Sequence, residues 1–533
     1  MATSLKHWLE RYRTALYPLL NFAVVLAAIV GSNVHGAEPG QAVYVCMLTA
    51  ICSTPLLLLR GWNDRYVLLG IFMALYYLEF GALDLSILVV GTDVQHARPE
   101  FLSSTELAVL VGAVLMLGTY LLGVRLGHGE DEAAAVRARR GLALPEWSTG
   151  TMLVLGLGLW LAGTSAMIYL QIFAAPEKTM HSAQSAFANM GPLMVFMVML
   201  GHMMQPLGIL ILSYGYAKRR GAFWAGLIVA VVLIEVAVGF VMDVKRVALM
   251  GGALVILTRT LVDNRLPKLW ILCCVTGLIL VFPVFQAYRM EISGARGLDR
   301  LQALHELPKV LSIALHAAEK EKEKPAEPGE RPQSFLERSS VKDSLETLFD
   351  HVPRDVPHLY GRSLVALPMA FVPRLIAPLK EDISAGQLFT KLVLKADGDT
   401  YISISHLGEL YWNFGWLGIF LGIPIGGTLL GYMGVRFNLE HGTSVTRVLV
   451  LMATVQSMCI QFEGTVPVSY ILWLRAMAAI GLLHVVFARE RSVGRAVTPG
   501  ESPEPGPRVP VPATPGLPIL RPMSVPRFPN LMR

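Results

Sequence analysis

Two ionisable side chains stand close together just before a long apolar run. His406 and Glu409 lie in the stretch SHLGELYWNFGW, and their i, i+3 spacing places them on one face of a helix. A carboxylate in this position can act as a general base or orient one. It can equally form a salt bridge with an arginine and fix the end of the helix, so the residues alone leave both roles open.

Basic side chains form the second group of candidates, because arginine offers planar, bidentate donors that suit phosphate groups. Several cations that converge at one membrane face would suit a lipid diphosphate. Taken singly, each is better explained by contact with lipid headgroups, whereas Arg246, Arg289 and Arg374 together favour a functional site. The full set of candidates is Lys245, Arg246, Arg289, Arg362, Arg374 and Lys380.

Three further ionisable residues, Glu79, His202 and Glu235, fall inside apolar runs. Polar groups at membrane depth are costly and are often functional. A single buried histidine is nevertheless more often a packing residue than a ligand, so we rank these three below the first two groups. The five cysteines also lie within apolar runs and lack metal-ligand spacing, so we expect no metal site.

The composition is that of a membrane protein. The chain has 533 residues, of which 54% are hydrophobic and only 16% charged, whereas a soluble globular protein carries roughly 25% charged residues. The mean hydropathy is +0.53. Because a lipid-exposed backbone must satisfy its own hydrogen bonds, and because the alternation of a membrane barrel is missing, we expect an all-α polytopic membrane protein.

The apolar runs predict about twelve transmembrane helices, if each needs roughly 17–25 residues. We expect one large loop on the outer face, at about 288–411, and a Pro-rich, disordered cytoplasmic tail at 491–533 after the membrane domain of 1–490. The predicted spans lie near 15–31, 43–60, 66–90, 105–125, 150–174, 192–215, 222–242, 246–262, 269–287, 412–435, 445–462 and 465–488.

Lysine and arginine are concentrated in alternate loops, which places both termini in the cytoplasm by the positive-inside rule. The N-terminus is interpreted as an uncleaved first span, although VHGA could serve as a signal-peptide cleavage site. Lys245 and Arg246 form an exception, since they stand in a short turn on the outer face. Charges placed against the topology signal suggest a functional role.

The outer segment carries its own helix signals. Residues 300–322 have helical periodicity with an apolar face. Ser340 and Asp343 precede LETLF, a pattern typical of a capped short helix. A further short helix is expected from Ser384 to Leu394. Walker loops, GxGxxG, HExxH, CxxC, GxSxG and EF-hand patterns are all missing from the sequence, which argues against an ATP-driven pump or a soluble-type hydrolase.

Two stretches carry a family resemblance. They are GRSLVALPMAFVPRLIAPLK, from Gly361 to Lys380, and SHLGELYWNFGWLGIFLG, from Ser405 to Gly422. Together with the long outer loop before a few final spans, they make the chain similar to the O-antigen polymerase family of oligosaccharide repeat-unit polymerases. The motifs cover about a quarter of the chain. This sequence differs from the family's pattern at Lys380-Glu381, where relatives often have a Lys-Pro pair, so the role of Lys380 stays open.

The resemblance implies an enzyme of the bacterial cytoplasmic membrane that joins undecaprenyl-diphosphate-linked oligosaccharides on its outer face. An acceptor hydroxyl would attack the anomeric carbon of the donor, and the lipid diphosphate would leave. Arginine can stabilise the charge that develops on that diphosphate. We therefore assign Arg246, Arg289 and Arg374 to the diphosphates, with Lys245, Arg362 and Lys380 beside them, and Glu409 or His406 to the role of base or its orienter.

The implied partners are the lipid-linked donor and acceptor, membrane lipids and a chain-length regulator, and neither a cofactor nor a nucleic acid is expected. Two alternatives remain. An O-antigen ligase, which moves the finished glycan to another acceptor, shares the span count and the large loop. A secondary transporter or lipid flippase also commonly has twelve spans with both termini inside, although no half-to-half repeat is evident here.

Overall fold

The chain divides into two units, Met1–Arg489 and Glu490–Arg533, and every described residue belongs to the first. The computed structural model describes residues 2–34, 38–90, 102–139, 147–169, 192–241, 245–277, 312, 340–369, 385–396, 402–440 and 443–488. Within these ranges the chain forms helices and turns, and no strand.

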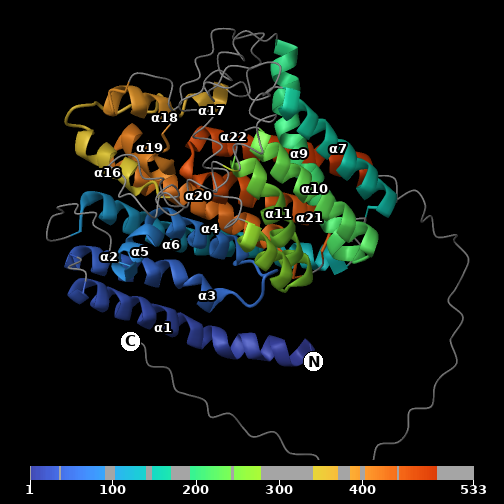
Figure 1. Ribbon diagram of the computed structural model, residues 1–533, viewed down its shortest axis with the longest axis horizontal. Coiled ribbons are helices and arrows are strands. Elements are labelled where there is room, and N and C mark those ends of the chain that lie inside the picture. The colour runs from blue at the N-terminus through green and yellow to red at the C-terminus, as the bar shows by residue number, and fades with distance from the viewer. Residues whose placement is uncertain are drawn as a thin grey trace, which may run out of the picture. The chain divides into compact units, whose positions relative to one another are not determined.

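The helices follow one another through the first unit and pack as one layered bundle (Figure 1). Their bounds are α1 Ala2–Val34, α2 Pro39–Ser53, α3 Pro55–Leu58, α4 Val67–Phe80, α5 Ala82–Val90, α6 Ser104–Arg139, α7 Thr149–Tyr169, α9 Pro192–Arg219, α10 Ala222–Val241, α11 Lys245–Asp263, α16 Lys342–His351, α17 Ala366–Met369, α18 Ala385–Leu388, η3 Phe389–Val393, α19 Ser405–Phe414, α20 Trp416–Arg436, α21 Val445–Thr454, η4 Val455–Cys459, η5 Ile460–Glu463 and α22 Val466–Ala488.

Eight helical segments in the described ranges are long and apolar enough to cross a membrane, which confirms a polytopic membrane protein of the all-α class. A ninth candidate is the pair α4 and α5, which bends by 54° at Gly81. The expected count of twelve stays a prediction, as does the large outer loop. The eight are Ala15–Val34, Pro39–Leu58, Ser104–Gly127, Thr149–Tyr169, Ala222–Gly239, Trp416–Arg436, Val445–Glu463 and Val466–Phe487.

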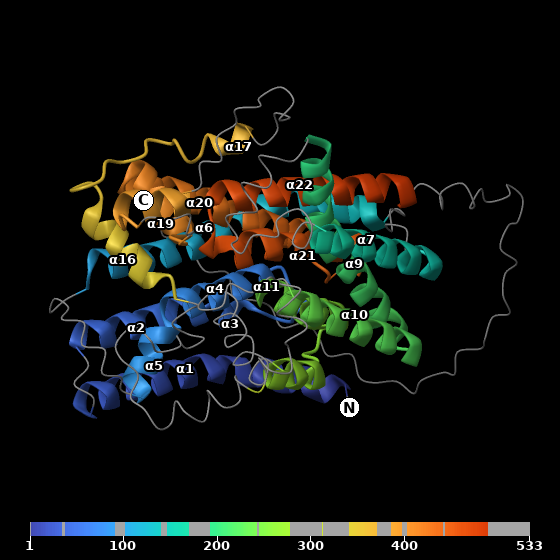
Figure 2. The ribbon, with the colours of Figure 1, turned by 45° about the horizontal axis from the view of Figure 1, so that its top comes forward.

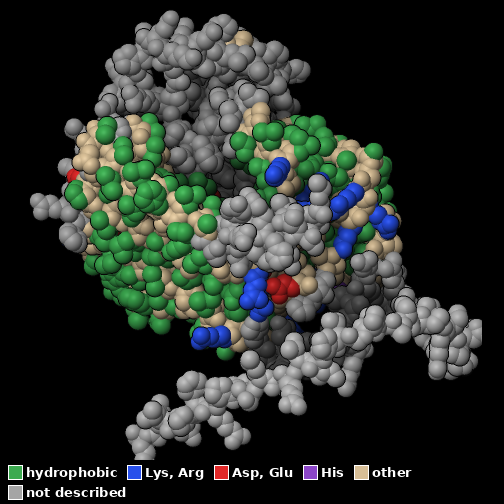
Figure 3. Space-filling view, turned by 90° about the horizontal axis from the view of Figure 1, so that it is seen from below, with side chains coloured by type: hydrophobic (Ala, Val, Ile, Leu, Met, Phe, Trp, Pro, Cys, Tyr) green, Lys and Arg blue, Asp and Glu red, His purple; other side chains and the backbone are tan. Residues whose placement is uncertain are grey.

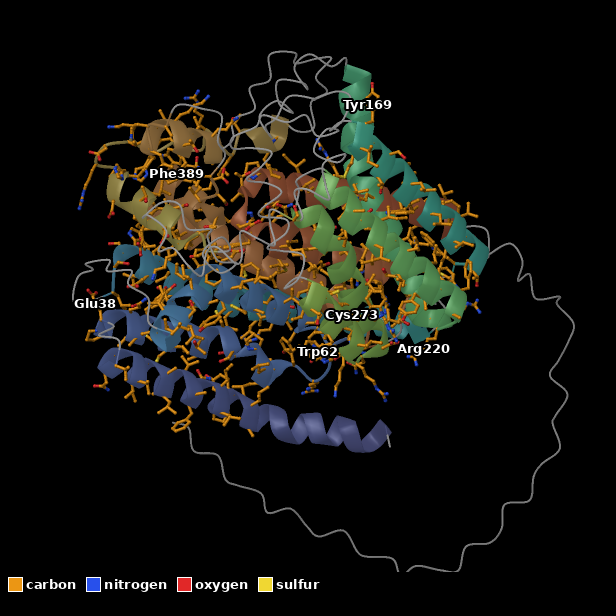
Figure 4. All side chains as sticks on the ribbon, in the orientation of Figure 1. Glu38, Trp62, Tyr169, Arg220, Cys273 and Phe389 are labelled. Carbon is orange, nitrogen blue, oxygen red and sulfur yellow. The ribbon has the colours of Figure 1, made fainter. Side chains whose placement is uncertain are left out.

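The basic loops that the sequence assigns to one side meet at one end of the helices. The backbone N–H of Trp62 donates to Asn264 Oδ1 at 2.6 Å. Tyr214 donates its hydroxyl to the carbonyl of Thr443 at 3.2 Å, and Lys218 donates to the Thr443 hydroxyl. Figure 4 shows Trp62 and Arg220 on the lower side of the molecule, away from Glu38, Tyr169 and Phe389. Four of the basic loops therefore lie at one end of the described helices, and the alternation of loops along the whole chain stays a prediction.

The opposite end holds short helices of the predicted outer segment. The expected helix around Ser340 and Asp343 is confirmed as α16, but the expected cap is wrong by one residue, because Val341 precedes the first turn and offers no side-chain cap. Ser340 Oγ accepts from the backbone N–H of Lys342 at 3.3 Å. The helix expected at 384–394 is confirmed as α18 and η3. The predicted helix at 300–322 lies outside the described residues apart from Ser312.

The predicted tenth span, 412–435, begins four residues later, at Trp416. Gly415 separates it from α19, and its φ of 61° with ψ of −148° is a backbone conformation that glycine tolerates best. Helices α19, α20 and α6 lie side by side (Figures 1 and 2). A Cβ atom at Gly431 of α20 would clash with the carbonyl of Tyr120 on α6, so the glycine allows the two helices to approach closely.

Candidate functional site

Helix α19 carries both candidate catalytic residues and is itself interior. Every residue from Ser405 to Asn413 is buried, although the sequence places this stretch before a membrane span. Leu407, Leu410 and Trp412 supply the apolar contacts that bury it. His406 and Glu409 are therefore enclosed by protein, which makes their protonation states sensitive to each polar neighbour.

Glu409 is a buried carboxylate with one satisfied oxygen. Oε2 accepts a hydrogen bond of 2.6 Å from the backbone N–H of Val466, the first residue of α22. Oε1 has no hydrogen-bond partner within the described part of the chain. Burial raises the pKa of Glu409 to about 7, against the opposing effects of the Ser363 hydroxyl and the Val466 N–H. The carboxyl group can therefore gain or lose a proton near neutral pH.

The alternative role for Glu409, a salt bridge, finds no support among the residues whose structure is described. No lysine or arginine within those ranges forms an ion pair with this carboxylate. Its partner is a helix N-terminus, whose unpaired N–H groups carry a partial positive charge. The contact holds α19 against α22 and leaves Oε1 without a partner among the described residues.

His406 is neutral and bonded elsewhere. Its Nε2 lies 2.8 Å from Ser469 Oγ, and that hydroxyl donates to the carbonyl of Gln461 at 3.0 Å. Burial lowers the pKa of His406 to about 3, against the opposing effect of the Thr465 backbone. An imidazole with this pKa does not supply positive charge at neutral pH. No hydrogen bond joins it to Glu409 in the described ranges, so His406 contacts α22 instead of orienting the carboxylate.

The two stretches that carry the family resemblance meet at α19. The backbone N–H of Gly361 donates to Asn413 Oδ1 at 2.9 Å, and Asn413 Nδ2 donates to Ser363 Oγ at 2.7 Å. The same Nδ2 donates to the carbonyl of Glu409 at 2.8 Å. Asn413 therefore fastens the 361–363 turn to the helix and brings the Ser363 hydroxyl beside the carboxylate. Arg362 lies on this turn with an exposed side chain.

An apolar cavity of about 250 Å³ adjoins the site. Ile425, which lines it, is 64% exposed, so the cavity reaches the surface of the helical bundle. His406 and Leu410 of α19 line the cavity. Val466, whose backbone N–H binds Glu409, lines it as well. The other lining residues are Phe72, Met116, Leu364, Leu367, Gly422, Ile423, Gly426, Leu430, Met458, Phe462 and Tyr470.

The convergence of basic residues stays a prediction. Arg289, Arg374 and Lys380 lie outside the described residues. Lys245 and Arg246 open α11, but their side chains are not among those described. Within the described ranges, no group of three or more histidine, cysteine or carboxylate side chains could hold a metal ion.

Glu235 is one of the three ionisable residues that the sequence places inside apolar runs, and both of its carboxylate oxygens accept hydrogen bonds from neutral side chains. Its carboxylate accepts from Trp160 Nε1 at 2.6 Å, from Thr164 Oγ1 at 3.1 Å and from Gln205 Nε2. These bonds explain how a carboxylate is tolerated inside α10. Glu79 Oε2 has no hydrogen-bond partner among the described residues. The side chain of His202 lies outside them.

Sequence reasoning did not single out a buried charge cluster beside α19. Lys342 Nζ lies 2.7 Å from Asp84 Oδ2 and 2.9 Å from Glu106 Oε1, and all three side chains are nearly inaccessible. The same ammonium group lies 4.3 Å from the centre of the Tyr44 ring. Lys342 thereby anchors α16 to α5 and α6, and Leu345 of α16 packs against Gly408 of α19. A single lysine in a short amphipathic helix does not indicate in the sequence that it will be buried against two carboxylates.

The fold and the site together define a polytopic α-helical membrane protein with an enclosed carboxylate at one end of its helices. No protein-family model, curated protein or solved structure matches the chain.

Proposed function

We propose that the protein is a polysaccharide polymerase that joins undecaprenyl-diphosphate-linked oligosaccharide units at the outer face of the cytoplasmic membrane. The observation that carries the proposal is Glu409, a buried carboxylate with a pKa of about 7 whose Oε1 has no hydrogen-bond partner among the described residues, and whose neighbours His406, Leu410 and Val466 line an apolar cavity. The family resemblance of 361–380 and 405–422 supports it, because Asn413 joins these stretches around Glu409.

In the proposed reaction, Glu409 accepts the proton of a hydroxyl group on the acceptor's terminal sugar. The hydroxyl oxygen forms a bond to the anomeric carbon of the donor glycan. The bond from that carbon to the diphosphate oxygen breaks, and the lipid diphosphate leaves with the electron pair. A general base contributes typically 10²–10⁴-fold to such a step. Arg246, Arg289 and Arg374 are assigned to the charge on the departing diphosphate.

The apolar cavity is proposed to hold part of a prenyl chain. Its wall includes Gly422, Ile425 and Gly426 of α20, a helix that exposes Leu417, Phe420, Leu421 and Ile425 on one side. A prenyl chain that enters from the bilayer would bring its diphosphate toward the polar turn at 361–363. Hydrophobic lining with a few polar groups is the usual make-up of a ligand cavity.

A deletion strain separates the three candidate functions. Loss of a polymerase leaves single repeat units on the final acceptor, and lipid-linked single units accumulate on the outer face of the membrane. Complementation with the full-length chain restores long polymer. Polymer that remains on the lipid carrier would contradict the proposal in favour of a ligase. Lipid-linked units that accumulate on the inner face would contradict it in favour of a flippase.

A further inference from the structure

An arginine-rich pocket lies at the end of the helices opposite Glu409. We define the arginine pocket by its lining residues, Arg220, Arg259, Asp263, Arg265, Leu266 and Pro267. Its volume is about 450 Å³. Figure 3 views the molecule from below and shows lysine and arginine side chains gathered on one half of this face, while apolar side chains cover much of the other half.

The charges in the pocket do not balance. Three arginines and one aspartate line it, which leaves two positive charges without a lining counter-ion. Asp263 binds two of the arginines, with Arg220 Nη2 at 2.7 Å from Oδ1 and Arg259 Nη2 at 3.3 Å from Oδ2. Arg265 forms no hydrogen bond or ion pair with the described residues. Like charges held together in this way favour binding of an anion.

The guanidinium groups of Arg220 and Arg259 are held in place, and all three arginines keep free donors. Arg259 lies over the Tyr216 ring at 4.7 Å and donates to its hydroxyl at 2.9 Å. Trp270 Nε1 donates to the same hydroxyl at 3.3 Å. The loop that carries Arg265 is fixed by the 2.6 Å bond from the Trp62 N–H to Asn264 Oδ1. Since each guanidinium has five N–H donors, most of those in the pocket remain available to a ligand.

The surroundings of the pocket suit a lipid. It lies where α9 ends at Arg219, where the apolar segment Ala222–Gly239 begins and where α11 ends at Asp263, so it stands at the edge of the membrane-spanning region. Exposed apolar side chains adjoin it in sequence, and they are Phe223, Leu266, Leu269 and Leu272. An acyl chain can lie against such side chains while its headgroup occupies the polar pocket.

We propose that the arginine pocket binds a phosphate group, and that this group belongs to the headgroup of an anionic phospholipid. Arginine pairs with phosphate oxygens through parallel, charge-assisted hydrogen bonds. A bound headgroup would join the turn between α9 and α10 to the loop after α11. The arginine pocket shares no lining residue with the cavity beside Glu409, so the two sites can be tested separately.

The test is native mass spectrometry of the full chain in detergent, titrated with cardiolipin and separately with phosphatidylcholine. We expect saturable binding of cardiolipin that Arg265→Gln weakens roughly tenfold, since a charge-assisted hydrogen bond contributes about that much. The matched control is Arg219→Gln, which removes one positive charge close to the pocket. Arg219 donates to Thr149 and does not line the pocket. The thermal stability of Arg265→Gln should equal that of the parent.

Three results would overturn the lipid assignment. Equal affinity for both lipids would mean that no anion site exists. An equal loss in Arg219→Gln would reduce the effect to general surface charge. Inorganic phosphate that displaces cardiolipin fully at millimolar concentration and constant ionic strength would assign the pocket to a soluble phosphate. If the polymerase proposal fails, each of these three results keeps the same meaning for the arginine pocket, because the titration measures lipid binding and not polymerisation.

Discussion

Glu409 binds the start of another helix, since its Oε2 lies 2.6 Å from the backbone nitrogen of Val466 in α22. Together with the His406–Ser469 bond, this contact joins the resemblance stretch 405–422 to α22. It also orients the carboxylate, because one oxygen is fixed while Oε1 is left without a described partner. Val466 lines the apolar cavity as well, so the carboxylate and the proposed prenyl site share a wall.

The pH dependence of polymerisation follows from the carboxyl group of Glu409. A base works only when deprotonated, and with a pKa of about 7 roughly a tenth of the groups are ionised at pH 6 and nine tenths at pH 8. The initial rate should therefore rise with pH and level off near pH 8. A rate that falls over this interval would assign Glu409 to the role of an acid.

Stability should change with pH in the opposite direction. The pKa of Glu409 is higher in the folded chain, so the folded state binds the proton more tightly than the unfolded state, and this stabilisation is lost as pH rises. The contribution is at most about 3 kcal/mol. Thermal unfolding of the parent and of Glu409→Gln should show a steeper decline from pH 5 to pH 8 in the parent. Parallel profiles would contradict the raised pKa.

Ser363→Ala should shift the pH profile upward. The Ser363 hydroxyl opposes the effect of burial, so its loss raises the pKa of Glu409 and moves the midpoint of the rate profile to higher pH. Ser469→Ala is the matched control, since it removes the hydroxyl that contacts His406 and leaves the surroundings of Glu409 intact. Equal shifts in both variants would show that the serines act through general packing.

Gly426→Leu tests whether the apolar cavity holds a prenyl chain. A Cβ atom at Gly426 would meet only the Tyr470 hydroxyl, at 3.2 Å, so a larger side chain can extend into the cavity. We expect a KM for the lipid-linked donor that is higher by roughly tenfold or more. Gly118→Leu is the control, because nothing lies within 4 Å of its Cβ position. An unchanged KM in Gly426→Leu would place the prenyl chain elsewhere.

Lys342→Met should destabilise the protein strongly. The change leaves Asp84 and Glu106 buried without their cation, which costs about 3–5 kcal/mol. Thermal unfolding in detergent measures the effect, with Lys395→Met at an exposed position as the control. Adding Glu106→Gln to Lys342→Met should recover part of the loss. A loss as small as that of the control would show that the buried cluster does not anchor α16.

The class of fold was predictable because it depends on local composition. Long apolar runs with few charges can form only membrane helices, and the short helices at 342–351 and 385–393 follow from local periodicity. The predicted span start at 412 falls inside the helix that carries Glu409, because Gly415 breaks the apolar run through its backbone conformation alone. A hydropathy pattern records side chains and not φ angles.

The details of the site were less predictable, since their partners are remote in sequence. Glu409 and His406 were identified from their types and spacing, but Val466 and Ser469, which bind them, lie some sixty residues further on. Asn413 stood within the resemblance motif, yet its bonds to the 361–363 turn depend on tertiary packing. Lys342 and Asp84 are 258 positions apart, and no local pattern reports such a pair.

Polymerisation by purified protein tests the central claim most directly. The full chain and Glu409→Gln are reconstituted in nanodiscs with an undecaprenyl-diphosphate-linked oligosaccharide, and chain growth is followed by gel electrophoresis. The parent should form long glycan and release lipid diphosphate. Glu409→Gln, which keeps an acceptor for the Val466 N–H, should be slower by at least about a hundredfold while its thermal stability is equal or higher. Chain growth by Glu409→Gln at the rate of the parent would contradict the account.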